Sequence, residues 1–156
     1  NKIDSINSIS ESDWDKIYNV NLKAPFLLTK NISRKMIENK YGRILNISSI
    51  FGVISKEGRA SYSTSKSGLI GLTKSSALDL APHNILVNSI SPGFVLTDLT
   101  KKILSSKEMN KLKKQVPLNR FASIEEIVNC ILFLIHENNS YITGQNIIVD
   151  GGFTSK

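Results

Sequence analysis

The chain has 156 residues, 40% hydrophobic and 7% aromatic, which is long and apolar enough for a globular domain with its own core. Its single cysteine, Cys130, excludes a disulfide scaffold and a thiolate-based zinc site, and indicates a reducing, cytoplasmic compartment. The net charge is +7, but the lysines are dispersed without interleaved aromatic residues, and no apolar stretch approaches the ~20 residues of a membrane span. We therefore expect neither a nucleic acid nor a membrane as a partner.

The first predicted element is a long helix that begins after Ser10 and continues to about Asn39. Ser10 and Asp13 have the spacing of a capping box, and apolar residues recur behind them at helical intervals. Pro25 interrupts this helix: proline has no N–H, so the carbonyl of Asn21, four residues earlier, loses its helical partner. Such a carbonyl can recruit the water molecule that a proton relay requires. A kink without function is the alternative.

Three short apolar runs predict strands at residues 43–48, 85–90 and 146–149. Their apolar density without clean alternation is typical of strands that are buried on both faces. Helical patterns separate the three runs, so the order of elements predicts parallel pairing through right-handed crossovers. The predicted fold class is α/β.

Helical patterns fill the segments between these runs. The first pattern holds Tyr62 at its start and ends at Pro82, where proline stops the helix. A polar helical stretch follows at residues 97–115. The last predicted helix opens with a capping box at Ser123 and ends near Ile135.

Ligands of parallel sheets gather beyond the carboxyl ends of the strands. The residues at these positions are Ser48, Ser49, Pro92, Gly93, Asp150, Gly151 and Gly152. A serine hydroxyl there can donate a hydrogen bond to a carbonyl oxygen as that oxygen gains negative charge. Because adjacent strand residues point in opposite directions, we expect only one of Ser48 and Ser49 to face the site.

Tyr62 and Lys66 stand four residues apart in a predicted helix and therefore share one helix face. An ammonium beside a phenol stabilises the phenolate, which makes Tyr62 a candidate general acid or base. Taken alone, the spacing also fits an ordinary surface pair. Ser49 lies thirteen residues before Tyr62 at a strand end, so we expect both side chains above the same end of the sheet.

Several motifs together resemble the short-chain dehydrogenase/reductase family, and most closely its 3-oxoacyl-acyl-carrier-protein reductases. They are Asn21, N-I-S-S at 46–49, Y-x-x-x-K at 62–66, Asn88 with Pro92 and Gly93, Thr97, Y-I-T-G at 141–144 and D-G-G at 150–152. The resemblance implies a Rossmann-like, doubly wound parallel sheet. It also implies NADPH- or NADH-dependent reduction of a ketone to a secondary alcohol. The implied substrate is a 3-oxoacyl thioester on acyl carrier protein, in fatty acid synthesis.

The resemblance also implies roles for single residues. Tyr62 would be the catalytic acid, Ser49 would hold and polarise the substrate oxygen, and Asn21 would hold a relay water through its main chain. Lys66 would bind the nicotinamide ribose beside Tyr62 and promote ionisation of the phenol. The segment against the nicotinamide would comprise Pro92, Gly93, Val95 and Thr97. No metal is implied, because the cofactor carries the chemistry. The family usually forms homotetramers in which long helices pack in pairs.

Motifs of the family's nucleotide-binding half do not occur in these 156 residues: the T-G-x-x-x-G-x-G turn and the N-N-A-G strand. By the resemblance, Asn1 falls just after N-N-A-G. We therefore expect residues 1–156 to be the catalytic and substrate half of one dinucleotide-binding domain, with roughly ninety residues absent. Such a piece should leave a sheet edge and apolar surface uncovered and should be inactive alone. Gly68 and Gly71, inside a helix, are interpreted as sites of close helix packing.

The resemblance further implies that residues 96–116 form a lid over the substrate. Their lysines, with Lys40, Arg43 and Arg120, are candidates to attract an acidic carrier protein or a phosphorylated thioester. Two alternatives stay open: a family member that acts on another small alcohol or ketone, such as a sugar or hydroxy acid, and a non-catalytic scaffold. The set Asn21, Ser49, Tyr62 and Lys66 argues against a scaffold, because folding does not require all four.

Overall fold

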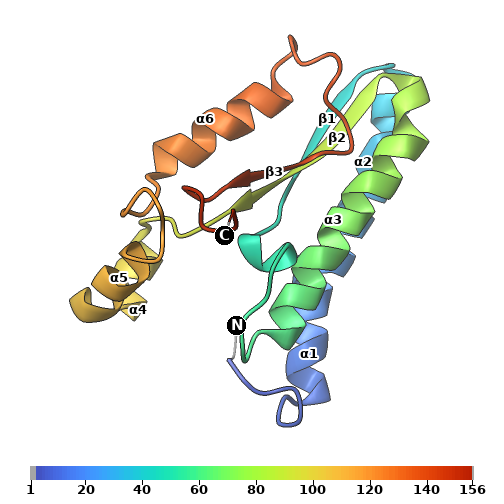
Figure 1. Cartoon of the computed structure of the whole chain (residues 1–156). Helices are drawn as coiled ribbons and strands as arrows, with labels where there is room; N and C mark the ends of the chain where they lie inside the picture. Colours follow the sequence, from blue (N-terminus) through green and yellow to red (C-terminus); the bar gives the residue numbers. More distant parts are fainter. Residues whose placement is uncertain (1–2, 156) are drawn as a thin grey trace.

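The computed structural model describes residues 3–155, so Asn1 lies outside the described part. Three parallel strands form one sheet in the order β1 (Gly42–Ile47), β2 (Ile85–Pro92) and β3 (Asn146–Val149), as Figure 1 shows. The predicted parallel strands and α/β class are confirmed. β2 continues two residues beyond the predicted end, to Pro92.

Helices cover both faces of the sheet. Helices α2 (Ala24–Glu38) and α3 (Ala60–Leu80) lie on one face, and α6 (Ile124–Ile135) lies on the other (Figure 1). Val87 of β2 packs in the core under α2 and α3, whereas Ile90 of the same strand packs against α6. Side chains alternate along a strand, so both faces of β2 are buried, as its apolar sequence predicts. The arrangement is a doubly wound sheet.

The predicted interruption of the N-terminal helix near Pro25 is present, but it is a π-helical turn within a continuous helical region. Ser10 caps α1 (Glu11–Tyr18) by accepting the N–H of Asp13, and a π-helical turn (Asn19–Lys23) joins α1 to α2. In that turn the N–H of Ala24 reaches back five residues to the carbonyl of Asn19. Pro25 therefore falls in the first turn of α2, where a missing N–H costs little.

The polar stretch predicted as one helix contains two. Helices α4 (Asp98–Ile103) and α5 (Ser106–Lys113) are separated at Leu104, whose backbone is extended. Ser105 and Glu108 form a capping box that starts α5. The prediction missed this box, because lysines surround it on both sides and no apolar run follows it.

Other helix ends follow the predicted signals. A 3-10 turn (Ala81–His83) holds Pro82 directly after α3, and Asn84 then adopts a left-handed conformation with φ of 60°. Ser123 and Glu126 form the predicted capping box of α6. A second 3-10 turn, η2 (Ile50–Gly52), follows β1.

The outer edge of β1 pairs with no other strand within residues 3–155. A hollow of about 360 Å³ lies between this edge and α2, and Val20, Leu28, Ile47 and Lys66 are among the residues that line it. Val20 is 71% exposed and Leu28 is 70% exposed. Apolar surface is thus uncovered at the edge of the sheet, as expected.

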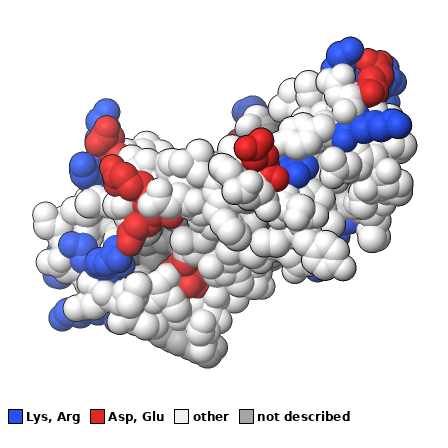
Figure 2. All heavy atoms as spheres, turned by 90° about the horizontal axis from the view of Figure 1, so that it is seen from above, with Lys and Arg blue, Asp and Glu red and all other residues white. Residues whose placement is uncertain are grey.

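Charged side chains of both signs are interspersed on the face shown in Figure 2, and uncharged atoms cover its middle. Within the described residues, no helix is long and apolar enough to cross a membrane. In the same part of the chain, no three His, Cys, Asp or Glu side chains cluster as metal ligands.

Candidate active site

The two serines after β1 have different partners. Ser48 donates its hydroxyl hydrogen to the main-chain oxygen of Lys66 on α3, at 3.0 Å. The Ser49 oxygen accepts the N–H of Phe51 at 3.2 Å and so caps η2. A hydroxyl that accepts in this way keeps its own hydrogen for donation. Within residues 3–155, Ser48 is therefore committed to α3, whereas Ser49 retains a donor for a ligand.

Helix α3 carries Tyr62 and Lys66 on one face, with Lys66 Nζ 5.8 Å from the centre of the Tyr62 ring. The ammonium donates a hydrogen bond of 2.7 Å to the main-chain oxygen of Ile47, the last residue of β1. This bond fixes Lys66 at the strand end that leads to Ser49. Burial lowers the pKa of Lys66, because desolvation disfavours the charged form.

Asn21 lies in the π-helical turn beside α3. Its side-chain amide donates to the hydroxyl of Ser65 at 3.1 Å, and Ser65 in turn donates to the carbonyl of Tyr62 at 2.8 Å. The structure thus places Asn21 in the lining of two hollows, one shared with Tyr62 and the other with Lys66. Ser65 is buried on α3, and the sequence offers no signal that separates it from the other serines there.

Phe51 and Arg59 also border this region, although no sequence pattern singles them out. The Phe51 ring packs edge-on against Tyr62, with 6.5 Å between ring centres. The Phe51 ring also contacts Arg59, whose guanidinium lies 5.7 Å from the ring centre. Both residues belong to the loop between β1 and α3, where periodicity carries no information.

The segment after β2 is held in place by backbone contacts. Gly93 donates its N–H to the carbonyl of Val149 at 2.9 Å, and a Cβ on Gly93 would lie 2.9 Å from the Asp150 Cα. Val95 bridges Ala122 in parallel. Thr97 caps α4 by accepting the N–H of Thr100 at 3.1 Å. Pro92, Gly93, Val95 and Thr97 therefore form one ordered segment across the carboxyl end of the sheet.

The D-G-G turn after β3 is stabilised internally. The Asp150 carboxylate accepts the N–H groups of Gly152 at 2.8 Å and Thr154 at 2.7 Å, and the Thr154 hydroxyl at 2.7 Å. Burial opposes ionisation of Asp150, but these hydrogen bonds outweigh it and lower the pKa of the carboxyl group. Gly151 and Gly152 have φ of 66° and 86°, a region that favours glycine. The Asp150 carboxylate thus forms its hydrogen bonds with residues of its own turn.

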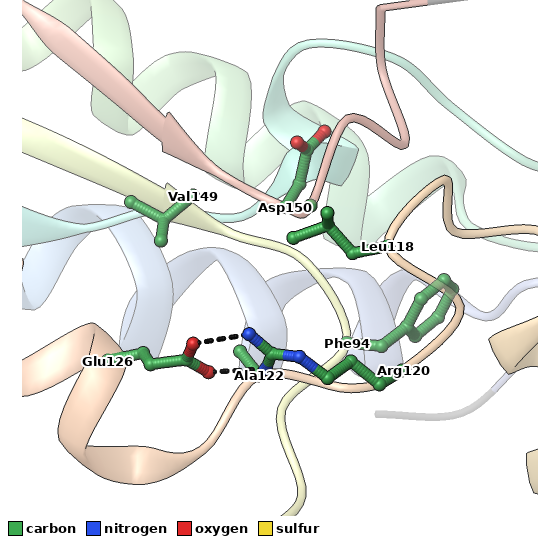
Figure 3. Close-up of a pocket in the computed structure, with 8 residues that line it drawn as sticks. Phe94, Leu118, Arg120, Ala122, Glu126, Val149 and Asp150 are labelled. Carbon is green, nitrogen blue, oxygen red and sulfur yellow. Dashed lines mark hydrogen bonds and ion pairs between the residues drawn. The ribbon is translucent and has the colours of Figure 1, made fainter.

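A small hollow of about 110 Å³ lies below this turn, and Figure 3 shows its lining. Arg120 makes two hydrogen bonds to the Glu126 carboxylate, of 2.8 and 2.6 Å, and so ties the loop before α6 to that helix (Figure 3). Arg43 donates to the carbonyl of Asn139 at 2.7 Å and lies 4.7 Å from the centre of the Tyr41 ring. Both guanidinium groups are engaged within the chain, which weakens them as attractors of a carrier protein.

Gly68 and Gly71 differ in their surroundings. A Cβ on Gly68 would lie 2.7 Å from a methyl group of Leu22, so Gly68 allows close packing of α3 on the π-helical turn, as predicted. Gly71 has no atom within 4 Å of that position among the described residues. The packing interpretation is therefore wrong for Gly71 within this chain.

The side chains present fit the ribose and nicotinamide end of a dinucleotide. The Lys66 ammonium uses one hydrogen on Ile47 and has two left, which suits neighbouring sugar hydroxyls. The sequence contains no T-G-x-x-x-G-x-G turn, so these residues do not offer the family's pyrophosphate cradle.

Comparison with known proteins decides the family. A family model described as enoyl-(acyl carrier protein) reductase matches residues 2–154. The 3-oxoacyl-[acyl-carrier-protein] reductase FabG of Aquifex aeolicus is 52% identical over 140 residues, which are 90% of this chain and 56% of that protein. The FabG of Rickettsia felis is 43% identical over 92% of this chain and 59% of its own length. The chain belongs to the short-chain dehydrogenase/reductase family.

Solved structures agree with this assignment. The complex of a 4-hydroxyisoleucine dehydrogenase mutant with NADH and succinate has a TM-score of 0.94 and 38% identity, over 99% of this chain and 65% of that one. ElxO with NADP bound has a TM-score of 0.95 and 28% identity, over 100% of this chain and 64% of its own. This short-chain dehydrogenase/reductase chain spans 56–59% of the curated relatives named above. The two solved structures contain NADH and NADP, respectively.

Proposed function

We propose that the chain supplies the catalytic half of an NAD(P)H-dependent reductase that converts the ketone of a 3-oxoacyl thioester to a secondary alcohol. The observation that carries this proposal is the position of Lys66, which lies beside Tyr62 and is fixed to the strand end before Ser49. The proposed setting is cytoplasmic fatty acid synthesis, with NADPH or NADH as the hydride donor. The names of the two FabG relatives support the substrate class.

In the proposed reaction, the nicotinamide supplies the hydride to the ketone carbon when the cofactor is bound. Ser49 donates its free hydroxyl hydrogen to the substrate oxygen, which polarises the carbonyl group. Tyr62 transfers its phenolic proton to the same oxygen, so that the alcohol forms and a phenolate remains. The Lys66 ammonium stabilises that phenolate, and a water held at the Asn21 main chain returns the proton. Lys66, Pro92, Gly93, Val95 and Thr97 hold the nicotinamide end of the cofactor.

We also propose that a nucleotide-binding half, in the same or another chain, covers the outer edge of β1. The unpaired edge, the hollow of about 360 Å³ and the exposed Val20 and Leu28 support this proposal. The 156 residues alone should then bind the dinucleotide weakly. Assembly as a homotetramer stays a prediction, which light scattering of the purified protein tests.

The test of the proposed chemistry is Tyr62→Phe in the longest reading frame that contains this chain. Loss of the hydroxyl removes the proton donor, so we expect at least a thousandfold lower kcat in NADPH oxidation with an acetoacetyl thioester, roughly the worth of a general acid. Tyr141→Phe is the matched control, because that side chain is 97% exposed and lies outside the site.

Retained turnover in Tyr62→Phe would refute the role of Tyr62. A panel with a small oxo acid and a keto sugar separates the proposed substrate from the alternatives. A wild-type protein that reduces none of these ketones with either cofactor would favour the scaffold.

A further inference from the structure

A cavity of about 600 Å³ lies between helices α4 and α5 and the loop that follows β1. Gly93 and Val95 line it, so it adjoins the proposed nicotinamide segment at the carboxyl end of the sheet, where Figure 1 places η2, α4 and α5. Its walls include apolar side chains from both sides, Phe51, Leu99, Ile103, Leu104 and Leu112. The cavity therefore suits the apolar part of a ligand, and its wall residue Phe51 connects it to Tyr62 by an edge-on ring contact.

The charged residues that line this cavity are unbalanced. Three are cations, Lys56, Arg59 and Lys111, and one is an acid, Glu108. Glu108 is already engaged, because its carboxylate accepts the N–H of Ser105 at 2.9 Å and the Ser105 hydroxyl at 2.6 Å. None of the three cations forms an ion pair within residues 3–155. The lining of the cavity therefore has an excess of positive charge, with three cations against one carboxylate.

Arg59 is the best placed of the three cations. Its guanidinium lies 5.7 Å from the centre of the Phe51 ring, and the same ring packs edge-on against Tyr62, so Arg59 and the proposed proton donor contact one shared aromatic residue. Contact with an aromatic face restricts the side chain. Arg59 is also half-buried, whereas Lys56 and Lys111 are exposed. A planar guanidinium held in this way matches the two oxygens of a carboxylate or phosphate.

We propose that Arg59, supported by Lys56 and Lys111, forms an anion subsite that selects substrates whose ketone is joined by an apolar spacer to a carboxylate or phosphate. This inference rests on the proposed function, because the cavity adjoins the residues proposed to reduce the ketone. Two sources carry this chemistry: the phosphate of a pantetheine thioester and the carboxylate of an oxo acid. Arg59 acts here as a specificity-determining residue and takes no part in proton transfer.

Titration calorimetry on the purified protein tests the subsite without turnover. The probes are two pairs that differ in charge: phosphopantetheine with pantetheine, and levulinate with methyl levulinate. In at least one pair, the charged member should bind about fivefold more tightly than the neutral member, as expected for one partly exposed ion pair. Arg59→Gln should abolish that preference. Lys74→Gln should retain the preference, because this substitution also removes one positive charge but at an exposed position on α3 that does not line the cavity.

A preference confined to phosphopantetheine identifies the phosphate as the source, and one confined to levulinate identifies the carboxylate. The proposal is overturned if neither pair shows a preference, if the preference survives Arg59→Gln, or if Lys74→Gln removes it equally. Thermal unfolding of Arg59→Gln checks that the variant is folded, and an unfolded variant is replaced by Arg59→Met with the same criteria. Charge preference without turnover of any ketone would leave the subsite standing and refute the proposed function.

Discussion

Gly52→Ala should move the loop that carries Ser49 away from helix α3, which carries Tyr62 and Lys66. Gly52 ends η2, where a Cβ would lie 2.7 Å from the Ser48 hydroxyl oxygen, 2.9 Å from the Lys66 carbonyl carbon and 3.0 Å from its oxygen. Carbon atoms normally approach to about 3.5 Å, so the loop has to withdraw from α3 by roughly 0.5 Å. The Lys66 contacts are backbone atoms of a helix and cannot rotate away. Ser49 would then move relative to Tyr62.

Two measurements follow from this displacement. Overpacking of this kind costs about 1–3 kcal/mol, which urea unfolding measures. Because a misplacement of about 1 Å can cost a hundredfold in rate, half of that distance should lower kcat for ketone reduction about tenfold. Ser67→Ala is the control: it removes the 2.8 Å hydrogen bond from Ser67 to the Gly52 carbonyl without adding an atom. Its kcat should stay within about twofold of the wild type. If Gly52→Ala keeps the stability and kcat of the wild type, the close contact between Gly52 and the Lys66 backbone does not position Ser49.

Two further predictions concern the loop before α6 and the uncovered edge. Arg120 lowers the pKa of Glu126 to about 2, below its ordinary value of 4.5. The ion pair therefore stabilises the fold fully above pH 4.5, and this contribution is lost as the pH falls through about 2. Glu126→Gln should therefore lower the melting temperature at pH 7, and its difference from the wild type should shrink as the pH falls from 4.5 towards 2. An equal difference at pH 7 and pH 3 would contradict the ion pair. The 156-residue chain alone should bind NADPH with a dissociation constant above ~1 mM in a fluorescence titration. This limit corresponds to a binding free energy of about −4 kcal/mol. Sub-millimolar binding by the folded chain would contradict the need for a covering half.

Local signals in the sequence predicted most of the fold. The apolar runs located all three strands, and the serines at positions 10 and 123 located two helix starts, because both depend on short-range chemistry. The division of residues 97–115 and the π-helical turn near Pro25 were missed. The π-helical turn depends on backbone hydrogen bonds that the sequence does not reveal, whereas the second helix of residues 97–115 restarts at a Ser105–Glu108 capping box that no apolar run follows. Periodicity identifies a helical region but not the ladder of hydrogen bonds within it.

The candidate site was predictable where it depends on helix spacing and strand ends. Tyr62 and Lys66 share a face of α3, as their spacing predicts. The hydrogen bond from Lys66 to the carbonyl of Ile47 was not predictable, because it joins residues nineteen positions apart through a main-chain atom. The same holds for Arg59, whose place beside Phe51 depends on how an irregular loop folds. Tertiary contacts of loops thus set the limits of sequence reasoning here.

Lys66 links the proposed chemistry to the uncovered edge of the sheet. It lines the hollow beside β1 together with Asn21, while its ammonium contacts Ile47 and faces Tyr62. Desolvation already lowers the pKa of Lys66, and any element that covers this hollow removes more water from the ammonium. A covering half would therefore complete the apolar core and change the electrostatic environment of Tyr62 in the same step. In the proposed reaction, stability and proton transfer would then depend on the same surface, which gives a physical reason for the proposed covering half.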